Sequence, residues 1–145
     1  MARTSTYLNF LGNTEEAFLF YKSVFGTDFL GPISRMGDIP PAPDMPPLSE
    51  AEKRYVMHLA LPILGGHVLM GTDVPDRMRE GFVFGTNVSI NLEPDTRADA
   101  DRLFAALSAG GKVDMAPQEM FWGGYFGYFD DKFGVSWMIN CEAKA

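Results

Sequence analysis

The sequence predicts an α+β fold in which two β-α-β-β-β modules pair into a curved, barrel-like cup. Three observations predict this fold. Two apolar helical stripes recur 83 residues apart, a strand motif recurs 68 residues apart, and each half shows one strand, one helix and three further strands. One helix covers only one face of a four-stranded sheet, so the modules are expected to bury their bare faces against each other. We expect the 145 residues to form a single domain, with module one at about 1–75 and module two at about 84–145.

The first module begins with a strand over residues 6–11, which Gly12 bounds. Asn13 and Glu16 have the spacing of a capping box, in which the Asn13 side chain accepts a hydrogen bond from the first turn of a helix. Gly26 is expected to end this helix. Its apolar stripe consists of Ala17, Phe20, Tyr21, Val24 and Phe25.

Three more strands are expected in module one, together with a proline-rich excursion. The first lies around residues 29–36, and strands over 55–63 and 67–73 form a hairpin around a two-residue Gly65-Gly66 turn. Residues 37–54 contain five prolines, which suit neither a helix interior nor a central strand. We interpret this excursion as a surface loop, with a lid as the alternative.

The second module follows a polar linker over residues 74–83 and repeats the order of the first. Its first strand alternates over 86–92, and Thr96 with Asp99 forms a second capping box. The helix is expected to end at Gly110-Gly111, and its stripe consists of Ala100, Leu103, Phe104 and Leu107. The remaining strands are expected over 112–120, 125–129 and 135–141.

Two sequence shifts align the halves. A shift of 83 places the second stripe on Ala17, Phe20, Tyr21 and Val24 of the first, and a shift of 68 places Gly134–Met138 on Gly66–Met70. Such internal similarity indicates one supersecondary unit used twice.

Composition excludes several classes of function. The chain has 12 Lys and Arg against 19 Asp and Glu, a formal net charge of −7, and no basic cluster, which argues against nucleic acid as a partner. No apolar run approaches the roughly 18 residues of a membrane span. A lone cysteine, Cys141, suits the reducing cytoplasm. Only two histidines are available to any reaction mechanism.

Several motifs together resemble the PhnB-like branch of the glyoxalase/bleomycin-resistance/dioxygenase (vicinal oxygen chelate) superfamily. They are Tyr7–Asn13, Glu16-Ala17, Phe20-Tyr21, Leu69–Asp73, Gln118-Glu119, Phe121-Trp122 and Asp131–Asn140. The resemblance covers essentially the whole chain and implies the glyoxalase/bleomycin-resistance fold and a homodimer with its cups at or near the subunit interface. Proteins that resemble this branch often carry the label demethylubiquinone methyltransferase. That activity is not expected here, because no Gly-rich nucleotide loop follows a predicted strand.

The resemblance also implies where a metal would bind. Enzymes of the wider superfamily hold a divalent ion with His or Glu at four strand positions. These positions fall on Ser5 or Thr6, on Met70, on Asn87 and on Met138. None is a histidine or a carboxylate, and thioethers do not suit a hard divalent ion. We therefore expect no metal and no other cofactor.

The two histidines lie on adjacent predicted strands. A two-residue turn would place His58 opposite Asp73, where a carboxylate could orient the imidazole as an acid–base pair. The same register turns both side chains to the outer side, away from the cup that Met70 faces, so the preferred interpretation is a surface pair. His67 begins its strand beside the turn and is expected to be solvated.

Strand alternation predicts a cup lined by amides, hydroxyls and thioethers, which favour ligand binding over acid–base chemistry. Residues 121–129 hold six aromatic side chains; Phe126 and Phe129 are assigned to the core, and Trp122, Tyr125 and Tyr128 to a pocket or a dimer interface. The predicted ligand-binding residues are Met70, Asn87, Gln118, Trp122, Ser136, Met138 and Asn140.

The preferred function is a metal-independent small-molecule binding protein in the cytoplasm. The alternative is a divalent-metal-dependent lyase, isomerase or dioxygenase, with His58 among its ligands. A third hypothesis is a dimeric interaction module whose cup is filled by side chains. The residues name no particular ligand, because one fold of this kind hosts many chemistries.

Overall fold

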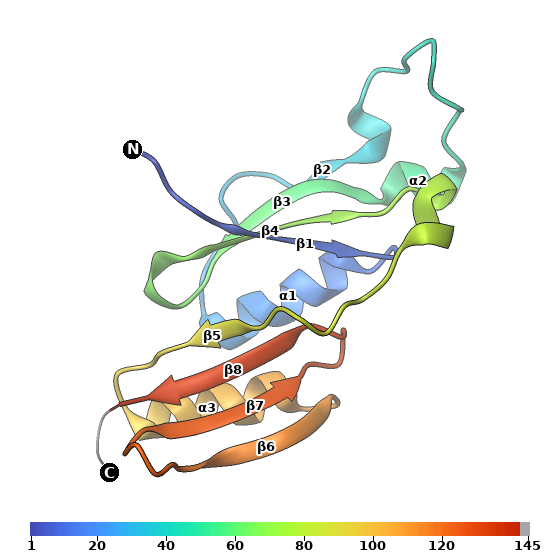
Figure 1. Ribbon diagram of the computed structural model, residues 1–145. Helices are drawn as coiled ribbons and strands as arrows, with labels where there is room; N and C mark the ends of the chain where they lie inside the picture. Colours follow the sequence, from blue (N-terminus) through green and yellow to red (C-terminus); the bar gives the residue numbers. More distant parts are fainter. Residues whose placement is uncertain (143–145) are drawn as a thin grey trace. The chain divides into compact units, whose positions relative to one another are not determined.

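The computed structural model describes residues 1–142 and divides into two compact units, which meet in the sequence between Phe82 and Val83 (Figure 1). Each unit is an α+β module with one four-stranded sheet. None of the helices in these residues has the length and apolar character needed to cross a membrane.

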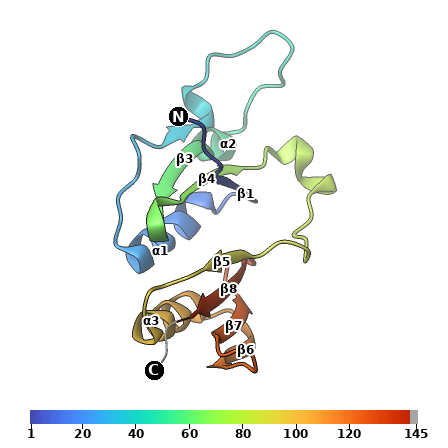
Figure 2. The ribbon, with the colours of Figure 1, turned by 60° about the vertical axis from the view of Figure 1, so that its left-hand side comes forward.

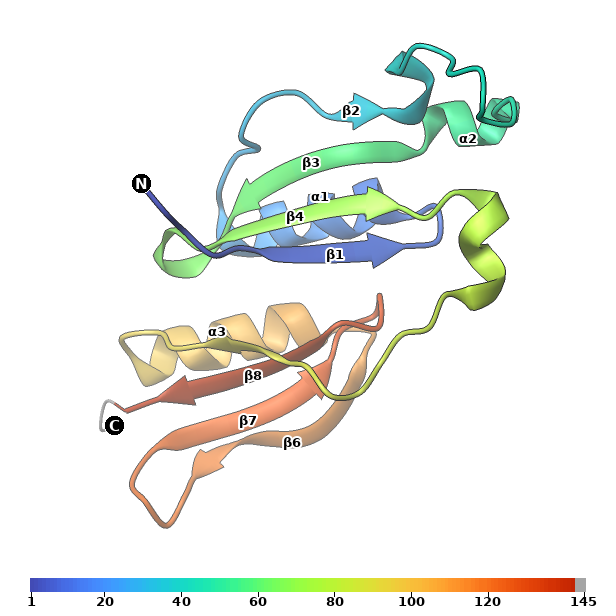
Figure 3. The same cartoon turned by 45° about the horizontal axis from the view of Figure 1, so that its top comes forward.

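Unit 1 has the predicted β-α-β-β-β order, with strands in the sheet order β1-β4-β3-β2 and β1 parallel to β4. Figure 3 shows α1 lying along one face of this sheet. The elements are β1 (Thr6–Phe10), α1 (Thr14–Phe25), β2 (Ser34–Arg35), η1 (Met36–Asp38), α2 (Glu50–Arg54), β3 (Val56–Pro62), η2 (Leu64–Gly66), β4 (Val68–Asp73) and η3 (Asp76–Gly81), where η marks a 3₁₀ turn.

Unit 2 repeats this arrangement in the sheet order β5-β8-β7-β6, with β5 parallel to β8. Its helix likewise lies along one face of the sheet (Figure 3). The elements are β5 (Ile90–Leu92), α3 (Arg97–Ser108), β6 (Lys112–Glu119), β7 (Tyr125–Asp130) and β8 (Ser136–Cys141).

The repeat is confirmed to the residue in the helices and in the strands β4 and β8. A shift of 83 places α1 on α3, and a shift of 68 places β4 on β8. The first strands differ by one more residue, because Leu8 pairs with Gly71 and Leu92 pairs with Ile139. The pairing of the modules into a cup stays a prediction.

The proline-rich excursion is a loop for most of its length, and Figure 2 shows it reaching away from the sheet of unit 1. Its proline-free end forms α2, which the sequence did not predict. Ser49 caps this short helix by accepting a hydrogen bond from the Glu52 amide at 3.1 Å. The predicted strands over 29–36 and 86–92 are shorter than expected, at two and three residues.

The helix stripes pack as amphipathic faces should, with one correction. In α3 the four predicted residues are buried. In α1 the buried aromatics are the predicted Tyr21 and also Phe18, whereas Phe20 and Phe25 are only half-buried. Phe18 lies edge-on to Phe10 with ring centroids 6.4 Å apart. A Cβ on Gly71 would come within 2.6 Å of the Phe18 ring, so the sheet has a glycine where this ring packs.

The two helices are capped in different ways. Thr96 Oγ1 accepts a hydrogen bond from the Asp99 amide at 3.1 Å, as predicted. The Asn13 side chain makes no capping hydrogen bond, so that prediction is wrong. At α1 the acceptor is Asp73 at the end of β4, which reaches the amides of Gly12 and Thr14 at 3.1 and 3.0 Å.

Candidate functional site

One face of the unit 2 sheet packs on α3, and the opposite face is called here the distal face of unit 2. Antiparallel pairing places Phe126 opposite Asn140, and Tyr128 opposite Met138. Residues directly opposite share a face, so these side chains lie together on the distal face. The alternate positions Phe129, Trp137, Ile139 and Cys141 are buried toward α3.

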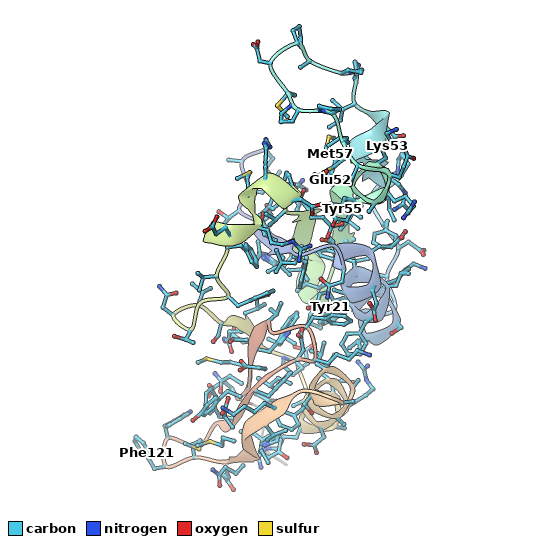
Figure 4. All side chains as sticks on the ribbon, turned by 90° about the vertical axis from the view of Figure 1, so that its right-hand side faces the viewer. Tyr21, Glu52, Lys53, Tyr55, Met57 and Phe121 are labelled. Atoms are coloured by element: carbon cyan, nitrogen blue, oxygen red, sulfur yellow. The ribbon has the colours of Figure 1, made fainter. Side chains whose placement is uncertain are left out.

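Four aromatic side chains form a continuous row on and beside this face, here called the aromatic row: Phe121, Trp122, Phe126 and Tyr128. Successive ring centroids are 5.1, 6.1 and 5.9 Å apart. Phe121 is almost fully exposed and projects from the β6–β7 turn, as Figure 4 shows. Trp122 is 48% exposed. The row can therefore offer ring faces to a flat apolar molecule.

The Asn140 side chain supplies a polar anchor beside the row. Its Nδ2 donates to Glu142 Oε1 at 3.1 Å, whereas its Oδ1 is the one buried side-chain polar atom in residues 1–142 without a hydrogen-bond partner. An unpaired buried acceptor costs about 1–3 kcal/mol, so a donor at this point would be stabilising.

Gly124 lets the Trp122 indole pack beside this anchor. Trp122 Nε1 and Asn140 Oδ1 both lie within 3.2 Å of the position that a Cβ on Gly124 would occupy. An indole N–H donor and an amide acceptor thus both approach Gly124, and the indole fills the space that a Cβ would need.

Five predicted ligand-binding residues belong to this region. Ser136, Met138 and Asn140 alternate along β8, Gln118 lies opposite Phe126 on β6, and Trp122 lies in the β6–β7 turn. The Ser136 hydroxyl already has a hydrogen-bond partner within the protein, because it donates to Asp130 Oδ1 at 2.7 Å.

The other two predicted residues lie elsewhere. Asn87 is exposed and precedes β5 without joining the sheet, because β5 begins only at Ile90. Met70 belongs to β4 of unit 1. The register on β5 aligns Asn91, and not Asn87, with Met138.

Two aromatic assignments need correction. Phe126 was assigned to the core but is half-buried on the distal face, opposite Asn140. Tyr125 was assigned to a pocket or interface but turns toward α3, where its hydroxyl donates to Asp101 Oδ1 at 2.6 Å and its ring lies 4.9 Å from the Arg97 guanidinium carbon. The hydrogen bond to Asp101 raises the pKa of the Tyr125 phenol.

In unit 1, the face turned away from α1 carries a second polar group of side chains. The Ser5 hydroxyl contacts Met70 Sδ at 3.8 Å, so the predicted first and second metal positions do lie side by side. The Tyr7 hydroxyl and His58 Nδ1 are 3.1 Å apart on the same face. Partial burial raises the pKa of Tyr7, so its phenol remains protonated at neutral pH.

The predicted pairing of His58 with Asp73 is wrong. The hairpin loop contains three residues, Leu64–Gly66, so Ile63 pairs with His67. The register therefore slips by one residue, and Ala60 lies opposite Met70. This slip brings His58 to the Met70 face and leaves Asp73 on the α1 side, as period-two alternation requires.

Asp73 has a structural role, because it joins three elements of unit 1. It is 2% exposed, and its Oδ1 accepts hydrogen bonds from the Gly12 and Thr14 amides and from the Thr14 hydroxyl, the last at 2.6 Å. Its Oδ2 accepts from the Val56 amide at 2.8 Å. One carboxylate thus ties the end of β4 to the start of α1 and the start of β3.

The donors at the superfamily metal positions do not fit a hard divalent ion. In unit 1 they are the Ser5 hydroxyl and the Met70 thioether, and in unit 2 Met138 again offers sulfur. Within residues 1–142 there is no group of three or more His, Cys, Asp or Glu side chains with the geometry to hold a metal ion.

Two β-α-β-β-β units of this sheet order in one chain define a protein of the glyoxalase/bleomycin-resistance fold. A glyoxalase/bleomycin resistance protein/dioxygenase family enzyme from Burkholderia phytofirmans PsJN superposes with a TM-score of 0.62, covering 95% of this chain and 98% of that one. At 19% identity this likeness concerns the fold alone.

Within that fold, the chain belongs to the PhnB-like family described as 3-demethylubiquinone-9 3-methyltransferase, whose sequence pattern matches residues 2–140. It is 33% identical to Protein YjdN of Escherichia coli over 141 residues, covering 94% of this chain and 92% of YjdN. The crystal structure of protein PA1353 from Pseudomonas aeruginosa has 35% identity and a TM-score of 0.79, covering 99% and 100% of the two chains. A putative 3-demethylubiquinone-9 3-methyltransferase, PhnB protein, from Bacillus cereus has 27% identity and a TM-score of 0.73, covering 97% and 99%.

Proposed function

We propose that this protein binds a small molecule without a metal ion, on the distal face of unit 2. The observation that carries the proposal is the convergence of the Trp122 indole N–H and the unpartnered Asn140 Oδ1 at Gly124, beside the aromatic row. A flat molecule with a donor and an acceptor on one edge fits these groups. Because Trp122 is 48% exposed, its ring can turn to admit such an edge.

We propose ligand binding and not acid–base catalysis, because the groups at the site are poor acids and bases. Amide, indole and thioether groups of Asn140, Trp122 and Met138 do not titrate near neutral pH. We further propose that the superfamily metal positions have been lost here, since the predicted positions, Ser5 or Thr6, Met70, Asn87 and Met138, hold no histidine or carboxylate.

The methyltransferase wording of the family description is not part of this proposal. A nucleotide-type cofactor binds where a parallel strand leads through a Gly-rich loop into a helix. In the described residues two connections lead from a parallel-paired strand into a helix, 11–13 and 93–96. The first contains one glycine, Gly12, and the second contains none. The Gly12 amide is already bound to Asp73.

Tryptophan fluorescence tests the binding proposal, because the two tryptophans differ sharply in environment. Trp137 is fully buried and its Nε1 donates to Asp131 Oδ2 at 2.8 Å, whereas Trp122 is half-exposed at the site. Titration with planar lactams such as 2-quinolone is expected to quench Trp122 saturably, equally with and without a chelator. The Trp122→Phe variant should lose the quench, since only Trp137 then reports.

A glycine pair provides the matched control for this titration. Gly124→Ala places a methyl group against the Trp122 indole and Asn140 Oδ1. Because it displaces the indole donor, we expect it to weaken binding by roughly tenfold or more. Gly81→Ala, at a glycine whose Cβ would meet nothing within 4 Å, should bind as the original chain does. Binding that requires added metal, or a panel of planar lactams that never affects Trp122, would refute the proposal.

We also propose that the protein is a homodimer and works in a reducing cytoplasm, where the buried free thiol of Cys141 would persist. The almost fully exposed Phe121 at the end of the aromatic row offers a surface that a second copy could cover. Sedimentation velocity at micromolar concentration is expected to give a dimer for the original chain and more monomer for Phe121→Ser. A monomeric original chain would contradict the dimer.

A further inference from the structure

Unit 1 contains a groove of about 490 Å³ that the proposed ligand site does not use. Its lining residues come from the start of α1, the end of β2, and α2: Gly12, Glu15, Arg35, Ala51, Arg54 and Tyr55. Figure 4 shows Tyr55 beside α2 in this part of the unit. The volume lies within the range of about 300–1,000 Å³ that small-molecule sites occupy.

We propose that this groove is a binding site for a small anion, a molecule carrying a phosphate or carboxylate group, held between Arg35 and Arg54. The proposal is independent of the ligand site on unit 2, because it rests on different residues in the other unit.

Arg35 is held in place for such a role. Its Nη2 contacts Glu15 Oε2 at 2.7 Å, and its Nη1 donates to the Arg54 carbonyl oxygen at 3.0 Å. Its own backbone amide donates to Asp38 Oδ2 at 3.0 Å. The hydrogen bond with Glu15 raises the pKa of Arg35, so the guanidinium stays charged. A planar guanidinium fixed at two points retains N–H donors for a bidentate oxyanion.

Arg54 supplies a second cation. It ends α2, its side chain is exposed, and within residues 1–142 its guanidinium forms no ion pair with a carboxylate. The nearby acidic groups are committed to other partners. Glu52 accepts from the Ser49 and Asp76 amides, and Asp76 Oδ1 accepts from the Tyr55 hydroxyl at 3.0 Å. Glu15 is the one carboxylate among the lining residues.

Among the lining residues alone, the balance of charge is positive. Two arginines and one glutamate line the groove, in a chain whose formal net charge is −7. Glu15 forms an ion pair with Arg35, and an incoming oxyanion would share or replace that contact. The Tyr55 ring, 3.4 Å from the position of a Cβ on Gly12, forms an apolar wall beside the charged groups.

Inorganic phosphate and citrate, each titrated into labelled protein, test the site through amide NMR shifts. We expect saturable shifts at Gly12 and Ala51 that weaken with added salt. Arg54→Gln should weaken binding by roughly tenfold. Glu15→Gln should instead tighten binding several-fold, because it removes the carboxylate that competes for Arg35.

Two variants with the same charge changes serve as controls. Arg3→Gln and Glu16→Gln alter exposed residues of unit 1 outside the groove, and should bind as the original chain does. A response to one anion only would support the site and identify its preferred group. Shifts that never saturate for either anion, equal affinity in Arg54→Gln, or weaker affinity in Glu15→Gln would overturn the proposal.

Discussion

Replacing Asp73 by alanine is expected to lower the free energy of unfolding by about 3–5 kcal/mol, enough to unfold a marginal module. The carboxylate accepts four hydrogen bonds at a site that is only 2% exposed. Its removal leaves the buried amides of Thr14 and Val56 without acceptors, and each such loss costs about 1–3 kcal/mol. Urea denaturation measures the loss, and amide hydrogen exchange at Thr14 and Val56 locates it.

Two further variants sharpen this test. Asp73→Asn keeps one oxygen acceptor but turns an NH₂ group toward an amide donor, so its stability should fall between those of the original chain and the alanine variant. Asp28→Ala, at a 93% exposed carboxylate paired with Lys22, should change stability by less than about 0.5 kcal/mol. A loss below about 1 kcal/mol in Asp73→Ala would show that the carboxylate does not hold these elements together.

Replacing Asp131 by alanine should have the second-largest effect, a loss of about 2–4 kcal/mol. Asp131 is 3% exposed and lies in the turn between β7 and β8. Its Oδ1 accepts from the Phe133 and Val135 amides at 2.8 and 3.1 Å, and its Oδ2 accepts from the Trp137 indole. Without it, a fully buried indole N–H loses its acceptor and the turn loses its organising group.

The effect of Asp131→Ala is measured in a Trp122→Phe background, where Trp137 is the remaining tryptophan. We expect the wavelength or intensity of the Trp137 emission to change, and the denaturation midpoint to fall. Asp130→Ala is the matched neighbour, because it removes a single hydrogen bond, from the Ser136 hydroxyl. We expect Asp130→Ala to cost about 1 kcal/mol or less. Equal losses in the two variants would contradict the assigned role of Asp131.

Periodicity predicted the helices and the repeat well, because both depend on local spacing. The α3 stripe and the shifts of 83 and 68 came directly from where apolar residues recur. Alternation also placed Ser136, Met138 and Asn140 on one face. Alternation could have corrected Phe126 as well, since it is three residues from the buried Phe129 and must point to the opposite face.

The failures involve choices that local sequence does not decide. Asn13 is a good capping residue by type, yet a carboxylate 59 residues further along the chain from Thr14 takes its place. Gly65-Gly66 fits a two-residue turn, but Leu64 joins the loop and moves every cross-strand partner by one. The groove around Arg35 and Arg54 also lay beyond prediction, because it needs α2 in place against α1 and β2.

Because of the two buried aspartates, Asp73 and Asp131, neither half of this chain could replace the other. The shift that aligns β4 with β8 puts Cys141 at the position of Asp73, and puts Ile63 at the position of Asp131. A chain built from two copies of either half would therefore inherit one anchor twice and lack the other. The two halves therefore share the spacing of their apolar residues and the order of their elements. They differ in the position of the buried aspartate that holds each sheet to its neighbouring segments.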